Sequence, residues 1–369
     1  MKKNTQDNMD SKNFGRNRGE NPKKDSCVEN PCNFCEVDSS VDFGGDFSKD
    51  SNKECLAHST KAQASAQSSP SESIASFPPL QILASKIAHF SELVAFKHTI
   101  FSASFILIAM CVASVESNGS IWVGTKTFCL CALALITARN FAMGFNRFCD
   151  RKIDALNPRT TSRPSVDGRI SSFSIAIFCA INALGFIATS YFINHLAFAL
   201  SVPFLLILGG YSLMKRFSSL AHLVLGISLG LAPIAGVIAV SGEISAWSVI
   251  LAVGVAFWVA GFDILYSLQD IEVDKREGLF SVPSRFGVRG ALIFSRVFHI
   301  FAVLAWVWFG MSAGLGAFGF VGIGISAIML CYEQYLVSKD FANIPKAFFV
   351  TNGYLGFILL GFIVLDALV

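Results

Sequence analysis

The chain has 369 residues, of which 53% are hydrophobic and only 15% are charged, and its net charge of +3 is too small to indicate binding to nucleic acid. This average hides two different regions. The first 78 residues carry 10 Lys or Arg and 12 Asp or Glu, so they cannot bury enough apolar surface to offset the entropy lost on ordering. We therefore expect a disordered tail over 1–78 and a membrane domain over 79–369, where charge is sparse because it is expensive in hydrocarbon.

The tail does not resemble a targeting segment. It lacks the apolar stretch and cleavage site of a secretory signal, and its acidic residues disfavour a mitochondrial transit peptide. A bacterial inner (plasma) membrane is the simplest location. Cys32 and Cys35 form one C-x-x-C with Cys27 nearby, so a zinc or redox site is an alternative to plain disorder, although the spacing to Cys55 fits no metal motif well.

Nine apolar runs follow the tail, each close to the length that crosses about 30 Å of hydrocarbon at about 1.5 Å per residue. Within lipid only helices or closed barrels satisfy the backbone, and these runs are too long and continuous for barrel strands. We predict an all-α membrane protein with nine transmembrane helices around a central cavity. The predicted helices are 93–115, 121–145, 172–193, 196–213, 220–240, 244–266, 291–310, 312–336 and 347–369.

Basic residues alternate between the two ends of these helices. Clusters of Lys and Arg follow the second, fourth and sixth helices, and two Lys flank the start of the ninth, whereas the other connections carry little beyond Glu116, Lys126 and Glu243. The positive-inside tendency therefore places the even-numbered connections in the cytoplasm. The tail should then be cytoplasmic and the C-terminus should lie outside.

Acidic residues recur at a spacing of four at the cytoplasmic ends of the second and sixth helices. Asn146, Asp150 and Asp154 share one helical face, and Asp270 and Asp274 repeat the spacing four helices later. An internal duplication would bring the two clusters face to face across the cavity. Like charges stacked this way persist most readily around a cation, and hard oxygen ligands suit Mg²⁺, which usually joins carboxylates to a substrate phosphate.

Basic residues accompany both clusters. Arg139 lies seven residues before Asn146, on its face, and could bind diphosphate oxygens together with other cations. Surface ion pairs at a helix end explain a single cluster equally well, but two clusters at equivalent positions favour a site. The cations that we expect at the diphosphate are Arg139, Lys152, Arg163, Lys215 and Lys275.

At these residues the chain resembles the UbiA superfamily of intramembrane prenyltransferases. The family motif N-D-x-x-D-x-x-x-D is present from Asn146 to Asp154, with Arg147 in place of the second residue. This replacement keeps the metal ligands but removes a carboxylate that could deprotonate the substrate. The resemblance covers about 90–369 and is closest to the branch of 4-hydroxybenzoate polyprenyltransferases, which includes members of the futalosine route to menaquinone. Further family motifs lie at 163–171, 211–216 and 263–287.

The resemblance implies that a polyprenyl group moves from polyprenyl diphosphate to a hydroxylated aromatic acid of the 4-hydroxybenzoate type, in the biosynthesis of a quinone (ubiquinone or menaquinone). It adds Tyr211 to the diphosphate site, and makes Asp263 either a base, a group that orients a tyrosine, or a structural partner of Lys215 or Tyr211. The same chemistry on a dihydroxynaphthoate acceptor in menaquinone synthesis is the alternative. The residues expected to bind Mg²⁺ are Asn146, Asp150, Asp154, Asp270 and Asp274. The residues expected to have a catalytic role are the same four aspartates and Asp263.

A cation transporter is the alternative from another class, because internal repeats with acidic sites occur in many transporters. Transporter sites lie near the bilayer midplane, however. The acidic residues here lie at one interface beside many Arg and Lys, which favours an anionic diphosphate over a passing cation.

Overall fold

The computed structural model of the chain describes residues 78–94 and 99–369. Residues 1–77 of the predicted tail, including its four cysteines, lie outside the described residues, so the tail and its boundary stay a prediction. Every regular element of the described part is helical. The longer helices are α1 (Pro78–Leu93), α2 (Thr99–Asn118), α3 (Thr125–Leu156), α4 (Ser172–Ile193), α5 (His195–Gly210), α6 (Ala221–Ser241), α7 (Ala246–Tyr266), α9 (Val282–Ser312), α10 (Ala317–Lys339) and α12 (Asn352–Leu368).

Short helical segments extend or connect these helices near the ends of the bundle. Two of them, η2 and η3, are 3₁₀ turns that carry predicted site residues, and η5 is a π-helical turn that leads into α12. The short segments are η2 (Tyr211–Arg216), η3 (Ser267–Asp270), α8 (Ile271–Arg276), η4 (Phe341–Asn343), α11 (Ile344–Lys346) and η5 (Ala347–Thr351).

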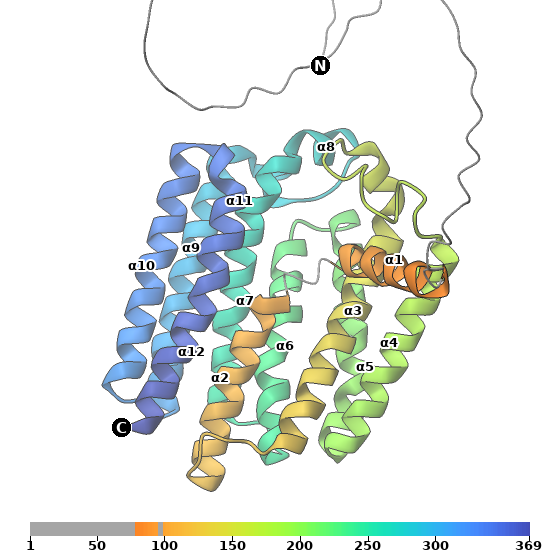
Figure 1. Cartoon of the computed structure of the whole chain (residues 1–369). Coiled ribbons are helices and arrows are strands. Elements are labelled where there is room, and N and C mark those ends of the chain that lie inside the picture. The colour runs from red at the N-terminus through yellow and green to blue at the C-terminus, as the bar shows by residue number, and fades with distance from the viewer. Residues whose placement is uncertain (1–77, 95–98) are drawn as a thin grey trace, which may run out of the picture. The chain divides into compact units, whose positions relative to one another are not determined.

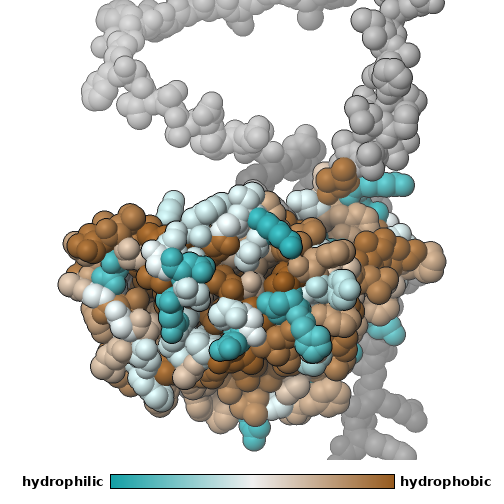
Figure 2. All heavy atoms as spheres, turned by 90° about the horizontal axis from the view of Figure 1, so that it is seen from below, coloured by the Kyte–Doolittle hydropathy of each residue, from teal (hydrophilic) through white to brown (hydrophobic). Residues whose placement is uncertain are grey.

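Nine long helices, α2 to α7 with α9, α10 and α12, correspond to the nine predicted runs, which confirms an all-α membrane fold for the described part of the chain. Eight spans are long and apolar enough to cross a membrane, and α2 adds a shorter apolar stretch over Ala103–Asn118. These helices run side by side in Figure 1, where α8 and the C-terminus lie at opposite ends of the bundle. Figure 2 views the end without α8: apolar side chains occupy much of its rim, and polar ones are more frequent toward its middle.

Two helix boundaries differ from the prediction in ways that shape the site. α3 continues to Leu156, well past the predicted end at 145, so the whole first cluster lies on one unbroken helix. α9 begins at Val282 rather than at 291, and its first residues are set off by a bend at Gly287, whose φ of 69° is a conformation that favours glycine. The bend gives the first residues of α9 a direction different from that of the rest of the helix.

Helix α1 was not predicted as a separate element, and it crosses the bundle rather than running along it (Figure 1). Its C-terminal half packs on α3 and α4: Leu93 is buried against Ile175, and the rings of Phe90 and Phe178 stack with centroids 4.7 Å apart. The Arg169 guanidinium pairs with both carboxylate oxygens of Glu92, at 2.6 and 2.9 Å. These contacts hold α1 beside the end of α3 that carries the first cluster.

The tightest packing lies around α7, the most buried of the long helices. Trp258 of α7 and Trp306 of α9 are fully buried, with ring centroids 6.2 Å apart. On the other side of α7, a Cβ added at Gly226 of α6 would lie 2.1 Å from the carbonyl oxygen of Ala256, so only glycine allows the two backbones to approach this closely. This packing fixes where the C-terminal end of α7 meets the cavity.

Candidate active site

A cavity of about 370 Å³ opens between α3, η2, α6 and α7. Aspartates and arginines line its end near α8, whereas residues such as Leu135, Phe186 and Ala232 line the part that lies deeper among the helices. The lining includes every predicted site residue except Lys152 and Lys275, which are exposed and lie outside it. The structure thus brings both acidic clusters to one cavity, as the sequence repeat predicted.

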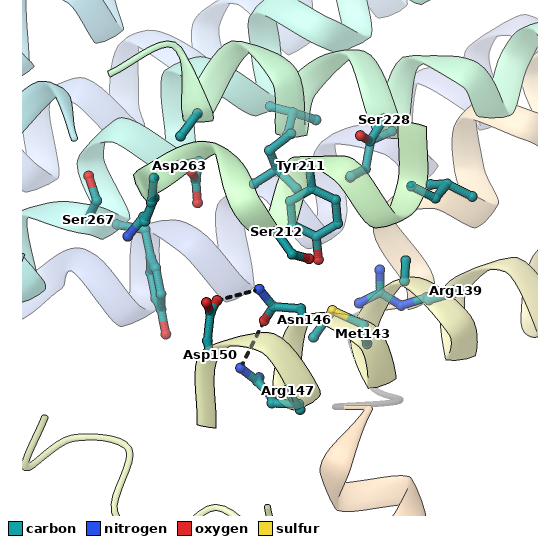
Figure 3. A pocket seen from close by; sticks show the side chains of 18 of the residues that line it. Arg139, Met143, Asn146, Arg147, Asp150, Tyr211, Ser212, Ser228, Asp263 and Ser267 are labelled. Carbon is teal, nitrogen blue, oxygen red and sulfur yellow. Dashed lines mark hydrogen bonds between the residues drawn. The ribbon is translucent and has the colours of Figure 1, made fainter. Parts of the chain in front are cut away.

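The first acidic cluster lies on the cavity face of α3 (Figure 3). The Asn146 amide Nδ2 donates to Asp150 Oδ2 at 2.8 Å, and Asn146 Oδ1 accepts from Arg147 Nη1 at 3.3 Å. One turn further, Asp154 is buried and accepts a hydrogen bond from Arg163 Nη1 at 2.6 Å. The unbroken helix therefore gives these residues the shared face that their spacing predicted.

The second cluster has the same spacing but a different backbone. α7 ends at Tyr266, Asp270 closes the 3₁₀ turn η3, and Asp274 lies in the short helix α8. A 3₁₀ turn has about three residues per turn rather than 3.6, so one α-helical face does not continue from Asp263 through η3 to Asp270 and Asp274. All three side chains nevertheless line the cavity.

Asp270 is held by Arg159, a residue that the sequence analysis did not assign to the site. Arg159 Nη2 lies 2.6 and 2.9 Å from the two carboxylate oxygens, and its Nη1 donates to the Tyr266 hydroxyl at 3.0 Å. Asn157 Nδ2 adds a hydrogen bond of 2.7 Å to Asp270. Burial opposes the charge on Arg159, but its hydrogen bonds to Asp270 and that negative charge raise the pKa of the guanidinium above its ordinary value.

The segment η2 supplies cations to both clusters. Arg216 Nη2 lies 3.1 Å from Asp150 Oδ1 in the first cluster, and Lys215 Nζ lies 3.7 Å from Asp274 Oδ2 in the second. The loop after α3 divides its cations in the same way, because one of its arginines binds Asp154 and another binds Asp270. Both η2 and the loop after α3 therefore supply one cation to each acidic cluster.

The carboxylates fit a metal ion that is shared with a ligand rather than one enclosed by protein. Asp154 Oδ2 and Asp274 Oδ2, one from each cluster, are buried and lack a hydrogen-bond partner within the described part. Yet over residues 78–94 and 99–369 no group of three or more Asp, Glu, His or Cys side chains lies close enough to hold a metal ion. Mg²⁺ commonly uses one or two carboxylates, with water and substrate phosphate completing its octahedron, so the donor set suits Mg²⁺.

Asp263 is held by a histidine that the sequence analysis did not consider. His222 Nδ1 and Asp263 Oδ2 are 2.7 Å apart, and His222 is buried on α6. The hydrogen-bond partner of Asp263 is therefore His222, rather than the Lys215 or Tyr211 named in one of the alternatives for this residue. No spacing rule links positions 222 and 263, so only the packing of α6 on α7 reveals the pair.

Arg139 reaches the cavity about seven residues, or about 10 Å, along α3 from Asn146. Figure 3 shows it on the far side of Met143 from Asp150, near Tyr211. Its buried Nε has no hydrogen-bond partner among the residues that the structure describes. A buried guanidinium nitrogen of this kind can bind an anionic group of a ligand.

Aromatic rings form part of the cavity wall beside the second cluster. The π-helical turn η5 places Phe348 in the lining, with its ring centroid 4.3 Å from that of Tyr266 and 5.2 Å from that of Phe262. π-helical turns are rare and often occur at functional sites. The Phe348 ring is tilted by 36° from that of Tyr266 and by 84° from that of Phe262, so the three rings form an angled apolar wall against which a ligand ring can pack.

Comparisons with known proteins relate this arrangement to membrane enzymes. The profile of the UbiA prenyltransferase family matches residues 102–360. The 4-hydroxybenzoate octaprenyltransferase of Saccharophagus degradans is 28% identical over 238 residues, which is 64% of this chain and 79% of that protein. The apo structure of a UbiA homolog from Aeropyrum pernix K1 is 32% identical, with a TM-score of 0.66 over 73% of this chain and 98% of its own. A UbiA homolog from Archaeoglobus fulgidus bound to DMAPP and Mg²⁺ has the same fold, with a TM-score of 0.59, 17% identity and coverage of 76% and 99%.

Proposed function

The chain belongs to the UbiA prenyltransferase family, and on that premise we propose that it transfers a polyprenyl group from polyprenyl diphosphate to a hydroxylated aromatic acid of the 4-hydroxybenzoate type. The observation that carries the proposal is the division of one cavity into a charged end and an apolar depth. A polyprenyl diphosphate has the same two parts. The similarity to a 4-hydroxybenzoate octaprenyltransferase supports the acceptor class.

The charged end is proposed to bind the diphosphate with Mg²⁺. Asn146, Asp150 and Asp154 on one side, and Asp270 and Asp274 on the other, would hold the metal. One buried oxygen in each cluster, Asp154 Oδ2 and Asp274 Oδ2, accepts no hydrogen bond within the described part, which supports this assignment. Bound Mg²⁺ would neutralise negative charge that grows on the leaving diphosphate. The Mg²⁺ in a fold neighbour supports this choice of metal.

Arginine and lysine side chains at this end would bind the diphosphate oxygens. Arg159, Arg163 and Lys215 now pair with carboxylates, and each can exchange that partner for a phosphate oxygen without leaving the cavity lining. The Tyr211 hydroxyl can add a neutral hydrogen bond. The charge of the leaving group is thereby met by groups that are already oriented, which lowers the barrier to ionisation.

The acceptor would lie deeper, between Arg139 and the aromatic wall. The distance of Arg139 from the acidic clusters favours pairing with the acceptor carboxylate over the diphosphate role expected from the sequence. The rings of Phe262 and Phe348 can pack against the acceptor ring. The cavity lining is largely apolar on this side, which excludes water that would otherwise quench an allylic cation.

The Asp263 carboxylate is proposed to take the phenol proton, which makes the neighbouring ring carbon more nucleophilic. The C–O bond of the donor breaks with its electron pair going to the diphosphate, and that ring carbon forms the new C–C bond to the prenyl group. The ring proton at this carbon then leaves with the diphosphate, which restores aromaticity. Asp263 returns its proton to the phenol oxygen, so the carboxylate is regenerated.

The location proposed is a bacterial inner membrane, with the α8 end in the cytoplasm and the C-terminus outside. Most Lys and Arg in the connections of the described part lie at the α8 end, which agrees with the positive-inside tendency. The bacterial relative in the family supports such a membrane.

The test is transfer by the full chain in detergent or in membranes, with polyprenyl diphosphate, Mg²⁺ and one acceptor at a time. We expect a prenylated product, identified by mass, with 4-hydroxybenzoate. A product with dihydroxynaphthoate but none with 4-hydroxybenzoate would instead assign the enzyme to menaquinone synthesis. Absence of product with both acceptors, from protein shown to be folded, would refute the proposed function.

A further inference from the structure

A buried histidine stands directly behind the carboxylate that faces the acceptor. His222 is only 1% exposed and is absent from the cavity lining, whereas the Asp263 side chain is 21% exposed and lines it. Their contact, from His222 Nδ1 to Asp263 Oδ2, is 2.7 Å long. Figure 3 shows Asp263 at the cavity, on the side opposite α3.

The other ring nitrogen of His222 fixes the direction of this hydrogen bond. The backbone N–H of Val282 donates to His222 Nε2 at 3.2 Å. A ring nitrogen that accepts a hydrogen bond carries no proton, so the proton of the neutral ring lies on Nδ1 and is donated to Asp263. Val282 is the first residue of α9, where backbone N–H groups lack partners within the helix. The start of α9 thereby sets the tautomer of the histidine.

This chain of contacts leaves Asp263 with one oxygen held and the other available. Oδ2 is bound from behind by the imidazole, so the rotamer of the carboxylate is fixed and Oδ1 is the oxygen left to meet a ligand. Outer partners of this kind orient a functional group and tune its basicity. A phenol proton can be accepted efficiently only by a carboxylate oxygen held within hydrogen-bond reach.

We propose that His222 is a positioning residue that orients Asp263 for activation of the aromatic acceptor, through a relay from the Val282 amide. This inference rests on the proposed function, because it needs an acceptor whose proton Asp263 accepts. His222 itself touches neither substrate. Its effect should therefore fall on kcat, while KM for polyprenyl diphosphate, which binds at the acidic clusters, should change little.

Two variants of equal size separate this role from simple packing. His222→Asn and His222→Leu both branch at Cγ, and neither side chain extends to the position of Nε2, which accepts from the Val282 N–H. They differ in that the Asn amide keeps a donor near the place of Nδ1. We expect His222→Leu to lower kcat by about 10- to 100-fold, the usual loss when an outer partner is removed, and His222→Asn to stay within about 3-fold of wild type.

The two variants should also be compared in an Asp263→Asn background, where a carboxylate no longer needs orienting. There the difference in kcat between Asn and Leu at position 222 should vanish. His222→Gln, whose longer amide also reaches Asp263, replaces the Asn variant if thermal unfolding shows that the latter is unstable. Equal kcat for the folded amide variant and His222→Leu, whether both are active or both impaired, would overturn the inference.

The wild-type protein separates this result from a failure of the proposed function. If wild type transfers no prenyl group to any aromatic acid, the proposed function fails. If wild type is active but the amide and Leu variants do not differ, only the role of His222 fails.

Discussion

The two acidic clusters share a spacing of four residues but differ in how the backbone presents them. The first follows the unbroken helix α3, so its carboxylates are stacked on one face. The second spans the end of η3 and the short helix α8, so Asp270 and Asp274 reach the cavity from two separate turns. A spacing of four thus predicts a shared face only for as long as the α-helix continues, and tertiary contacts decide the rest.

The clusters also differ in how their arginines bind. Arg159 binds Asp270 through two nitrogens, Nε to Oδ1 at 3.1 Å and Nη2 to Oδ2 at 2.6 Å. Arg163 instead makes one contact with Asp154, from Nη1 to Oδ1. Bidentate pairs depend on the planar fork of arginine, and single contacts depend mainly on charge. The second cluster should therefore be the more sensitive to the shape of its cation.

Removing one carboxylate from either cluster should have the largest effect. Asp150→Ala and Asp270→Ala should each lower Mg²⁺-dependent transfer by on the order of 10³-fold, because charge on the leaving diphosphate is no longer balanced. Product formation measured by mass, with thermal unfolding as the control for folding, tests both. Full turnover in either variant would show that the two clusters are not equivalent. It would also contradict the proposal that both clusters hold the metal.

Lysine substitutions should sharpen the difference between the clusters. Arg159→Lys should lower kcat/KM for the donor by about 10- to 30-fold, and Arg163→Lys by about 3-fold, because lysine keeps the charge but loses the fork. Arg169→Lys is the matched control, since Arg169 belongs to the same loop but pairs with Glu92 outside the cavity. Similar values for all three variants would show that the bidentate contact is unimportant.

A smaller effect is expected from widening the contact between α6 and α7. Gly226→Ala should lower stability by about 1–3 kcal/mol, because its Cβ meets a backbone oxygen and the helices must move apart. Since the second cluster follows α7 in the chain, this shift should change its position relative to α6. The matched control is Gly324→Ala in α10, where an added Cβ meets nothing within 4 Å. Thermal unfolding of both in one detergent measures the contrast, and an unchanged Tm for Gly226→Ala would contradict it.

The smallest effect is expected at the two exposed lysines. Lys152→Ala and Lys275→Ala should keep kcat/KM within about 2-fold, because exposed charges far from the ligand are screened by solvent and salt. Both were expected from the sequence to bind diphosphate. A loss of 10-fold or more in either would show that the lysine side chain reaches the bound donor.

Sequence reasoning located the membrane helices and both clusters because hydrophobic length and a spacing of four are local signals. It missed α1, whose apolar residues are interrupted by Lys86, His89 and Glu92, so that the segment does not form a spanning run. The basic loops were recognised, but Arg159 could not be distinguished from its basic neighbours. Which arginine meets which carboxylate depends on how the loop after α3 folds over α8.

Arg147 is a second residue whose identity stood out in the sequence but whose contacts could not be predicted from it. The sequence showed that it replaces a family carboxylate, but not what it would contact. In the structure it donates to Asn146 Oδ1 at 3.3 Å and to the carbonyl oxygen of Leu93, at the end of α1, at 3.4 Å. It therefore links α1, a helix that sequence patterns did not reveal, to the first residue of the first acidic cluster.

The ion pairs of the second cluster have a thermodynamic consequence. On the proposed function, a diphosphate that draws Arg159 and Lys215 away from their carboxylates would leave Asp270 and Asp274 freer to bind Mg²⁺. By linkage, Mg²⁺ that occupies those carboxylates frees the same cations for the diphosphate, and each ligand must raise the affinity of the other by the same factor. The apo protein, with its ion pairs closed, would then bind either ligand weakly alone and both tightly together.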